Sequence, residues 1–186
     1  MPRSQSDALA VEPYDLGESP SHLLRRVEQL ASDRFANLVG EDLTLRQFTV
    51  LSAVATQPGL SQADLTRATG IDRSTLADLV VRMERRGWID RTASLLDARA
   101  QSVHLSETGK QLLLAATQHA RAADAAILDE LPRTKRKSLL NILMKLAKIA
   151  EQKAEKAAKK AQKKAKHDAR KKKPVSGKRS KQSAKP

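Results

Sequence analysis

The chain has 186 residues, no cysteine and a formal net charge of +14. Its length allows one ordinary domain with extensions, and the lack of cysteine excludes disulfides and thiolate metal sites. No apolar run reaches about 18 residues, so we expect no membrane span and a cytoplasmic protein. The four histidines are scattered without metal-ligand spacing or a nucleophile partner. We therefore expect no metal, no cofactor and no enzyme activity.

The positive charge is concentrated at the end of the sequence. Residues 151–186 hold 15 of the 35 Lys and Arg residues but only 3 of the 21 Asp and Glu residues. This leaves a net charge of only +2 for residues 1–150. Any DNA binding by this body must therefore follow from where its arginines lie, and not from the pI of the chain.

The N-terminal part predicts a mobile arm over residues 1–18, which contain prolines and a glycine. Ser19 or Ser21 can then cap a helix over residues 19–38, whose apolar side chains recur at helical spacing. The segment 44–47 reads Thr-Leu-Arg-Gln, a capping-box pattern that opens a second helix.

Two short helices joined by a tight turn follow. Ser61 caps the first of them, and Gly70 ends it because glycine readily adopts the left-handed conformation. Asp72 caps the second. The residues of this second helix that recur at i, i+3, i+4 and i+7 form its expected buried stripe, namely Leu76, Leu79, Val80 and Met83.

A hairpin and two longer helices complete the body. Residues 88–91 and 101–105 alternate like strands around a polar loop. Ser106 caps a helix to about Leu131, and Pro132 starts a final helix that we expect to end near residue 150. The order predicts a mainly α fold with a small β-wing. Residues 45–105 form its winged helix-turn-helix, which places one helix in the major groove of DNA.

The helix capped by Asp72 carries polar side chains opposite its buried stripe. Arginine is the commonest reader of guanine, and an arginine in the wing suits a narrow minor groove. Asp78 can accept from cytosine or orient Arg82 four residues on. A solvated surface remains the alternative for any single side chain. The predicted DNA-binding residues are Ser61, Gln62, Arg73, Ser74, Thr75, Asp78, Arg82, Arg91, Asp97 and Arg99.

The stretch Leu45–Gly109 resembles the MarR family of bacterial regulators. The matching motifs are Pro58-Gly-Leu-Ser-Gln, Asp72-Arg-Ser-Thr-Leu, Val80-Val-Arg-Met-Glu-Arg-Arg-Gly-Trp-Ile and Asp97-Ala-Arg before Val103-His-Leu-Ser. Ala98 and Ala100 depart from the family pattern, which often has proline and arginine there, and this departure implies a looser wing that keeps Arg99. The resemblance covers roughly residues 20–150. It implies an obligate homodimer with intertwined helices over 19–38 and 106–150, a pseudopalindromic operator and release by a small molecule.

The residues themselves also favour a homodimer and an effector site. The last two helices carry more apolar side chains than a small winged domain needs, which indicates an interface. His22 and Arg26 share an edge of the first helix, and arginine pairs a carboxylate through two bonds. The predicted effector-binding residues are His22, Arg26, Phe48 and Thr49, and simple surface positions for the first two are the alternative. Residues 21–26 resemble MarR members that respond to aromatic acids and, weakly, repressors of nicotinate breakdown, which implies an aromatic carboxylate or a hydroxylated nicotinate.

The Lys-rich tail, residues 151–186, resembles linker histones and histone-like bacterial proteins in composition only. Lysines at i, i+4 repel one another, so we expect a largely disordered tail that forms partial helix on DNA. It would attract any phosphate backbone in a salt-dependent way, or act only as a solubilising tail. The leading hypothesis is a ligand-responsive repressor with DNA, itself and a small aromatic acid as partners. The alternative is a nucleoid-associated architectural DNA-binding protein.

Overall fold

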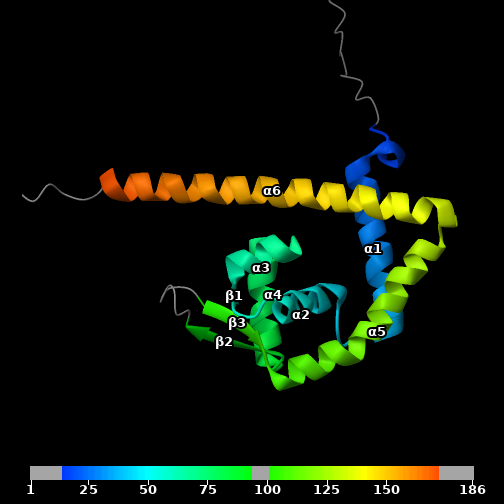
Figure 1. Ribbon diagram of the computed structural model, residues 1–186, viewed down its shortest axis with the longest axis horizontal. Helices are drawn as coiled ribbons and strands as arrows, with labels where there is room; N and C mark the ends of the chain where they lie inside the picture. The colour runs from blue at the N-terminus through cyan, green and yellow to red at the C-terminus, as the bar shows by residue number, and fades with distance from the viewer. Residues whose placement is uncertain (1–13, 94–100, 172–186) are drawn as a thin grey trace, which may run out of the picture.

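The structure, a computed structural model, describes residues 14–93 and 101–171. In chain order its elements are η1 (Leu16–Glu18), α1 (Pro20–Val39), α2 (Leu45–Thr56), β1 (Leu60–Ser61), α3 (Gln62–Thr69), α4 (Arg73–Arg85), β2 (Ile89–Ala93), β3 (Gln101–Leu105), α5 (Glu107–Asp129) and α6 (Arg133–Lys171). Figure 1 shows α2, α3, α4 and the strands as one lobe, with α1 beside α5 and the long α6 passing over α3. The predicted helix-turn-helix followed by a small sheet is confirmed.

The sheet has three antiparallel strands in the order β1–β3–β2. Val103 of β3 pairs with Leu60 on one side and with Arg91 on the other. The hairpin of β2 and β3 was predicted from the sequence, whereas β1 was not. β1 has only two residues, which is too short for an alternating pattern to be seen.

The helices begin at the residues that the sequence predicted. The hydroxyl of Thr44 accepts from the N–H of Gln47 at 3.3 Å, and Oε1 of Gln47 accepts from the N–H of Thr44 at 2.9 Å. Ser106 caps α5 by accepting from the N–H of Gly109 at 3.0 Å. Of the two candidate caps of α1, Ser19 accepts from the N–H of His22. These caps fix where each helix starts relative to the core.

The core lies beneath α4 and gives this helix its orientation. Its four predicted stripe residues are buried, and so are side chains of α2, α3 and the sheet around them. These buried apolar residues are Val50, Leu51, Val54, Leu60, Leu65, Leu76, Leu79, Val80, Met83, Ile89 and Val103. Because the buried stripe faces this core, the opposite side of α4 must face solvent.

The start of α5 sits directly against the base of the wing. A Cβ built on Gly109 would lie 1.9 Å from the carbonyl oxygen of Trp88, a distance that no side chain can tolerate. The hydroxyl of Ser106 also donates to the carbonyl of Gly87 at 2.5 Å. The absence of a side chain at Gly109 is therefore what allows α5 to join the wing closely.

The last helix is longer than the sequence predicted. α6 runs over 39 residues to Lys171, so the expectation of disorder is wrong for residues 151–171. Alanine is the best helix former, and the i, i+4 pair between Glu155 and Lys159 at 2.6 Å offsets part of the lysine repulsion. The rest of the tail lies outside the described residues. So does most of the predicted N-terminal arm, which ends in η1.

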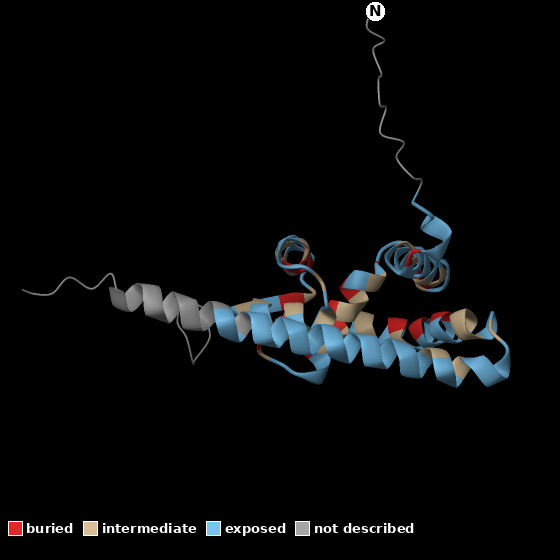
Figure 2. Cartoon of the chain, turned by 90° about the horizontal axis from the view of Figure 1, so that it is seen from above, coloured by how far each residue is buried: buried red, intermediate tan, exposed pale blue. Residues whose placement is uncertain are grey.

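α1 and α6 expose apolar side chains that the single chain leaves uncovered. Figure 2 shows α6 exposed over almost all of its described side chains. The large exposed apolar residues on the two helices are Leu23, Leu24, Val27, Leu30, Leu38, Leu140, Ile142, Leu143, Met144, Leu146 and Ile149. Patches of this extent are typical of surfaces that are covered by a partner.

Candidate nucleic-acid interface

The first turn of α4 is held by its cap. Oδ1 of Asp72 accepts from the N–H of Thr75 at 3.0 Å and from the hydroxyl of Ser74 at 2.7 Å. The bonds from Thr75 above all, and those from Ser74, hold the pKa of Asp72 far below its usual range. Asp72 is therefore charged at neutral pH and stabilises the helix N-terminus.

α4 presents a solvent-facing strip opposite its buried stripe. Successive residues of an α-helix are about 100° apart, so Arg73, Ser74, Asp78 and Arg82 fall within half a turn of one another. All four are exposed, whereas Thr75 is half-buried at the edge of the strip. The structure thus brings together four of the predicted DNA-binding residues on one helix face.

The predicted link between Asp78 and Arg82 takes a different form. Nε of Arg82 donates to the backbone carbonyl of Asp78 at 3.3 Å. No ion pair joins the two side chains among the interactions of the described residues. The carboxylate of Asp78 therefore stays available as an acceptor toward a base edge.

The N-terminus of α3 already contains a negative charge. Oδ2 of Asp64 accepts from the hydroxyl of Ser61 at 2.6 Å and from its N–H at 3.2 Å, and Asp64 also pairs with Arg67. These contacts, the Ser61 hydroxyl first, lower the pKa of Asp64. Ser61 and Gln62 are among the predicted DNA-binding residues, and the carboxylate of Asp64 would oppose a phosphate bound there.

Arg91 is engaged inside the domain. Its guanidinium donates to the carboxylate of Glu84 near the end of α4, and only 23% of its side chain is exposed. The hydrogen bond lowers the pKa of Glu84 and raises that of Arg91. The predicted DNA contact of Arg91 would have to compete with this pair, which ties β2 to α4. The predicted wing residues Asp97 and Arg99 lie outside the described residues.

The sequence missed a cluster at the C-terminal end of α4. The guanidinium of Arg86 lies 4.9 Å from the ring centre of Trp88 and donates to the carbonyl of Asp42 at 2.9 Å. Arg82 and Arg85 line a hollow of about 400 Å³ beside it. The Arg-Arg-Gly-Trp motif was visible in the sequence, but its contact with the residue 44 positions earlier was not.

The four predicted effector residues do not meet within one chain. Phe48 packs on Phe35 of α1, with ring centres 5.3 Å apart. On a helix with about 100° per residue, His22 and Arg26 fall on the side of α1 opposite Phe35. Helical periodicity therefore places Arg26 away from Phe48 within one chain.

Thr49 lies instead at a hollow that the sequence did not reveal. This hollow has a volume of about 470 Å³ and lies between α1, α2 and the turn that joins α3 to α4. Arg46 lines it and pairs with Glu28 of α1 at 2.6 Å, while both side chains stay more than half exposed. The turn contributes Thr69, Gly70, Ile71 and Asp72. Arg46 lies within the capping-box motif, but that motif depends on Thr44 and Gln47. The sequence therefore provided no reason to select Arg46.

The fold and the α4 strip together define a winged-helix DNA-binding protein. A sequence model of the MarR family matches residues 41–100. The HTH-type transcriptional repressor NicR of Pseudomonas putida is 32% identical over 135 residues, which cover 72% of this chain and 85% of the relative. The chain therefore belongs to the MarR family of transcriptional regulators, and it is not an enzyme.

Solved structures of similar fold are regulators as well. PcaV of Streptomyces coelicolor, in complex with its natural ligand, has a TM-score of 0.67 and 28% identity, covering 75% of this chain and 99% of that one. BpsR of Bordetella bronchiseptica has a TM-score of 0.66 and 28% identity, covering 73% of this chain and 98% of that one. The BpsR structure concerns regulation of DNA binding by 6-hydroxynicotinic acid.

Across residues 14–93 and 101–171, no helix is both long and apolar enough to cross a membrane. The same residues contain no group of three or more His, Cys, Asp and Glu side chains that could hold a metal ion.

Proposed function

We propose that this chain is a ligand-responsive repressor that binds a pseudopalindromic operator as a homodimer and is released by a small aromatic acid. The observation that carries the proposal is the exposed strip of α4, held rigidly by the Asp72 cap and by the buried stripe. The body carries a net charge of only +2. Placement of a few side chains, and not bulk charge, then has to supply its recognition of DNA.

Within this strip each side chain has a distinct role. Arg73 and Arg82 read guanine through paired donors, and Asp78 accepts from cytosine. Ser74 keeps acceptor capacity while its hydroxyl donates to Asp72. Phosphate contacts would come from Ser61, Gln62, Thr75 and Arg91. The predicted wing arginine, Arg99, would enter the minor groove and be held in place by Asp97. Base contacts then set the sequence, and phosphate contacts set the position of the protein.

The homodimer would cover the apolar faces of α1 and α6. A twofold axis between two copies would present two α4 helices about 34–36 Å apart, one turn of DNA. That spacing is why the operator is expected to be pseudopalindromic. The regulated DNA would be in the bacterial cytoplasm.

The effector would bind in the hollow beside Arg46. The volume of about 470 Å³ is in the range of small-molecule sites. Arg46 can exchange its exposed pair with Glu28 for two bonds to an aromatic carboxylate, while the ring packs on Leu45 and Ile71. The similarity to BpsR makes 6-hydroxynicotinic acid the first compound to test.

Occupancy of this hollow would act on DNA binding through the turn between α3 and α4. Asp72 lines the hollow and also caps α4. A ligand that displaces the turn would therefore reorient the first turn of α4, which carries Arg73 and Ser74. A shift of this kind favours release only if the ligand binds the displaced turn more tightly.

The DNA-reading role is tested by selecting a preferred duplex from a random-sequence library and measuring its affinity at fixed salt. Arg73→Ala and Arg82→Ala should each weaken that duplex by about 1–3 kcal/mol and relax preference at one position. Arg121→Ala, an exposed arginine on α5, serves as the matched control and should change little. Equal losses in all three variants would contradict the role of α4.

The effector site is tested by calorimetric titration of 6-hydroxynicotinic acid and other aromatic acids. Arg46→Ala should abolish the heat of binding, whereas Arg26→Ala should retain it. Loss of binding in Arg26→Ala alone would return the site to the face of α1 that the sequence indicated. No heat from any acid with the wild type would remove this effector class.

A further inference from the structure

The C-terminal half of α6 has two different sides. Residues Lys153, Lys156, Lys159 and Lys160, which we name the lysine arc, are all exposed. At about 100° per residue they fall within about 120° of the helix circumference. The opposite side carries Ala147, Ala150, Glu151 and Ala154, so the four lysines of the arc lie apart from these small apolar residues.

The side opposite the lysine arc faces the DNA-binding lobe. Ala147, Ala150, Glu151 and Ala154 line a hollow of about 700 Å³ together with Thr66 to Asp72 of α3 and the following turn. The carboxylate of Glu155 pairs with Lys159, and this contact, with a smaller effect from Arg67 of α3, lowers its pKa. Glu151 thus lies at the α3 side of α6.

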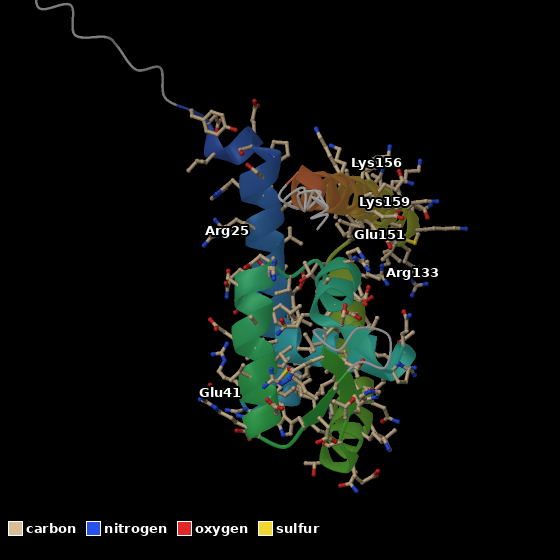
Figure 3. All side chains as sticks on the ribbon, turned by 90° about the vertical axis from the view of Figure 1, so that its left-hand side faces the viewer. Arg25, Glu41, Arg133, Glu151, Lys156 and Lys159 are labelled. Carbon is tan, nitrogen blue, oxygen red and sulfur yellow. The ribbon has the colours of Figure 1, made fainter. Side chains whose placement is uncertain are left out.

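The lysine arc therefore points away from the strip of α4. In Figure 3, α4 lies at the left edge of the molecule, whereas Lys156 and Lys159 project from the upper right, on the far side of α6 from α3. Glu151 lies on the lower side of α6 in the same view. A duplex bound along α4 would thus have α3 and α6 itself between it and the lysine arc.

We propose that the lysine arc binds the phosphate backbone of a second DNA duplex while α4 is bound to a first one, so that the protein bridges two DNA segments. The proposal rests on the proposed function for the first duplex. α6 is a straight helix of 39 residues, or about 58 Å, and its cations are fixed on a rigid rod. Rows of lysine match the continuous phosphate charge of DNA.

A duplex fits this surface better than a lipid bilayer does. Membrane-surface helices need bulky apolar side chains opposite their cations. Residues 151–160 have only alanines as apolar residues, and Ala154 faces α3. Attraction by the lysine arc would be independent of sequence, because phosphate contacts carry no base information.

A capture assay tests the bridge with the full-length protein. Beads carry the duplex that the protein selects, and a fluorescent duplex without that sequence is free in solution. Wild type should retain the free duplex on the beads. Replacement of all four lysines of the arc by glutamate should reduce retention about tenfold or more at moderate salt.

A matched variant separates position from total charge. Arg121→Glu, Arg133→Glu, Lys135→Glu and Lys137→Glu together make the same charge change at exposed residues away from the lysine arc. This variant should retain the free duplex within about twofold of wild type. Circular dichroism confirms that both variants stay helical. Equal loss of retention in both variants would overturn the proposal.

The amount of protein on the beads distinguishes the two duplexes. The arc variant should still occupy beads with the selected duplex and not beads with a scrambled one. If it leaves the selected duplex as well, the lysines act on the first duplex and the bridge is overturned. Undiminished capture by the arc variant also overturns it. If wild type does not prefer the selected beads, the proposed function fails instead.

Discussion

The charge of the Asp72 cap makes the stability of α4 depend on pH. Its folded pKa lies below its unfolded value, so the ionised cap contributes stability above the unfolded pKa of about 3.9. That contribution is lost as the pH falls toward the folded pKa. Asparagine also caps helices but does not ionise.

The expected result is a urea midpoint for wild type that falls relative to Asp72→Asn between about pH 6 and about pH 3. Other carboxylates titrate in both proteins, so the difference between the midpoints isolates Asp72. A difference that stays constant over this range would show that the charge of Asp72 does not hold the cap.

At Gly109 the fold leaves no room for a side chain. Its added Cβ would meet backbone and not a flexible side chain. Gly109→Ala should therefore destabilise the protein by about 3 kcal/mol, which is the upper range for overpacking. The exposed neighbour Thr108 provides the control, since Thr108→Ala should change the free energy of unfolding by about 0.5 kcal/mol at most. Comparable denaturation midpoints for the two variants would contradict the close contact.

At the residue scale the sequence predicted helix caps well and distant pairings poorly. The caps at Thr44, Ser61, Asp72 and Ser106 depend on residues three positions apart, and all four are confirmed. The pair of Arg46 with Glu28 joins two helices, and no local pattern encodes such a contact. The roles of the α4 side chains in DNA binding stay predictions.

At the scale of elements, the structure differs from the sequence prediction over residues 151–171, which form part of α6 and not a disordered tail. Counting lysine repulsion favoured disorder, whereas alanine propensity and continuity with a stable helix favour α6. Helix that is already nucleated costs little to extend. The two-residue β1 was not predicted from the sequence, because its pairing with β3 comes from the fold and not from a local pattern.

The length of α6 can be measured by far-ultraviolet circular dichroism. A chain ending at residue 150 should lose the helical signal of residues 151–171 compared with the full chain at the same molar concentration. Raising the salt concentration should leave that difference in place or increase it, because screening weakens the repulsion among lysines. An unchanged molar ellipticity after truncation would show that the segment is unstructured in the free protein.

At the scale of the whole molecule, the uncovered faces of α1 and α6 predict the assembly. Leu143 belongs to the apolar face of α6, whereas Leu114 stands alone on α5 with 78% exposure. Leu143→Glu should convert a dimer to a monomer, and Leu114→Glu should not. Light scattering after size-exclusion chromatography gives the masses. A monomeric wild type, or a dimeric Leu143→Glu, would contradict the proposed interface.

We propose that recognition of DNA sequence and attraction to phosphate lie in different parts of the molecule. α4 belongs to a nearly neutral body, whereas most of the positive charge lies beyond residue 150. Specific DNA binding is typically about 10³-fold or more tighter than non-specific binding by the same protein. If α4 is the reader, this ratio belongs to the body and should survive changes in the lysine arc.

The most direct test of the account is the ratio of affinities for the selected duplex and a scrambled duplex, measured at one salt concentration. The account predicts a ratio of about 10³ or more for wild type, a similar ratio for the arc variant and a ratio near one when Arg73 and Arg82 are both replaced by alanine. Equal affinity of wild type for the two duplexes would contradict it and indicate an architectural DNA-binding protein.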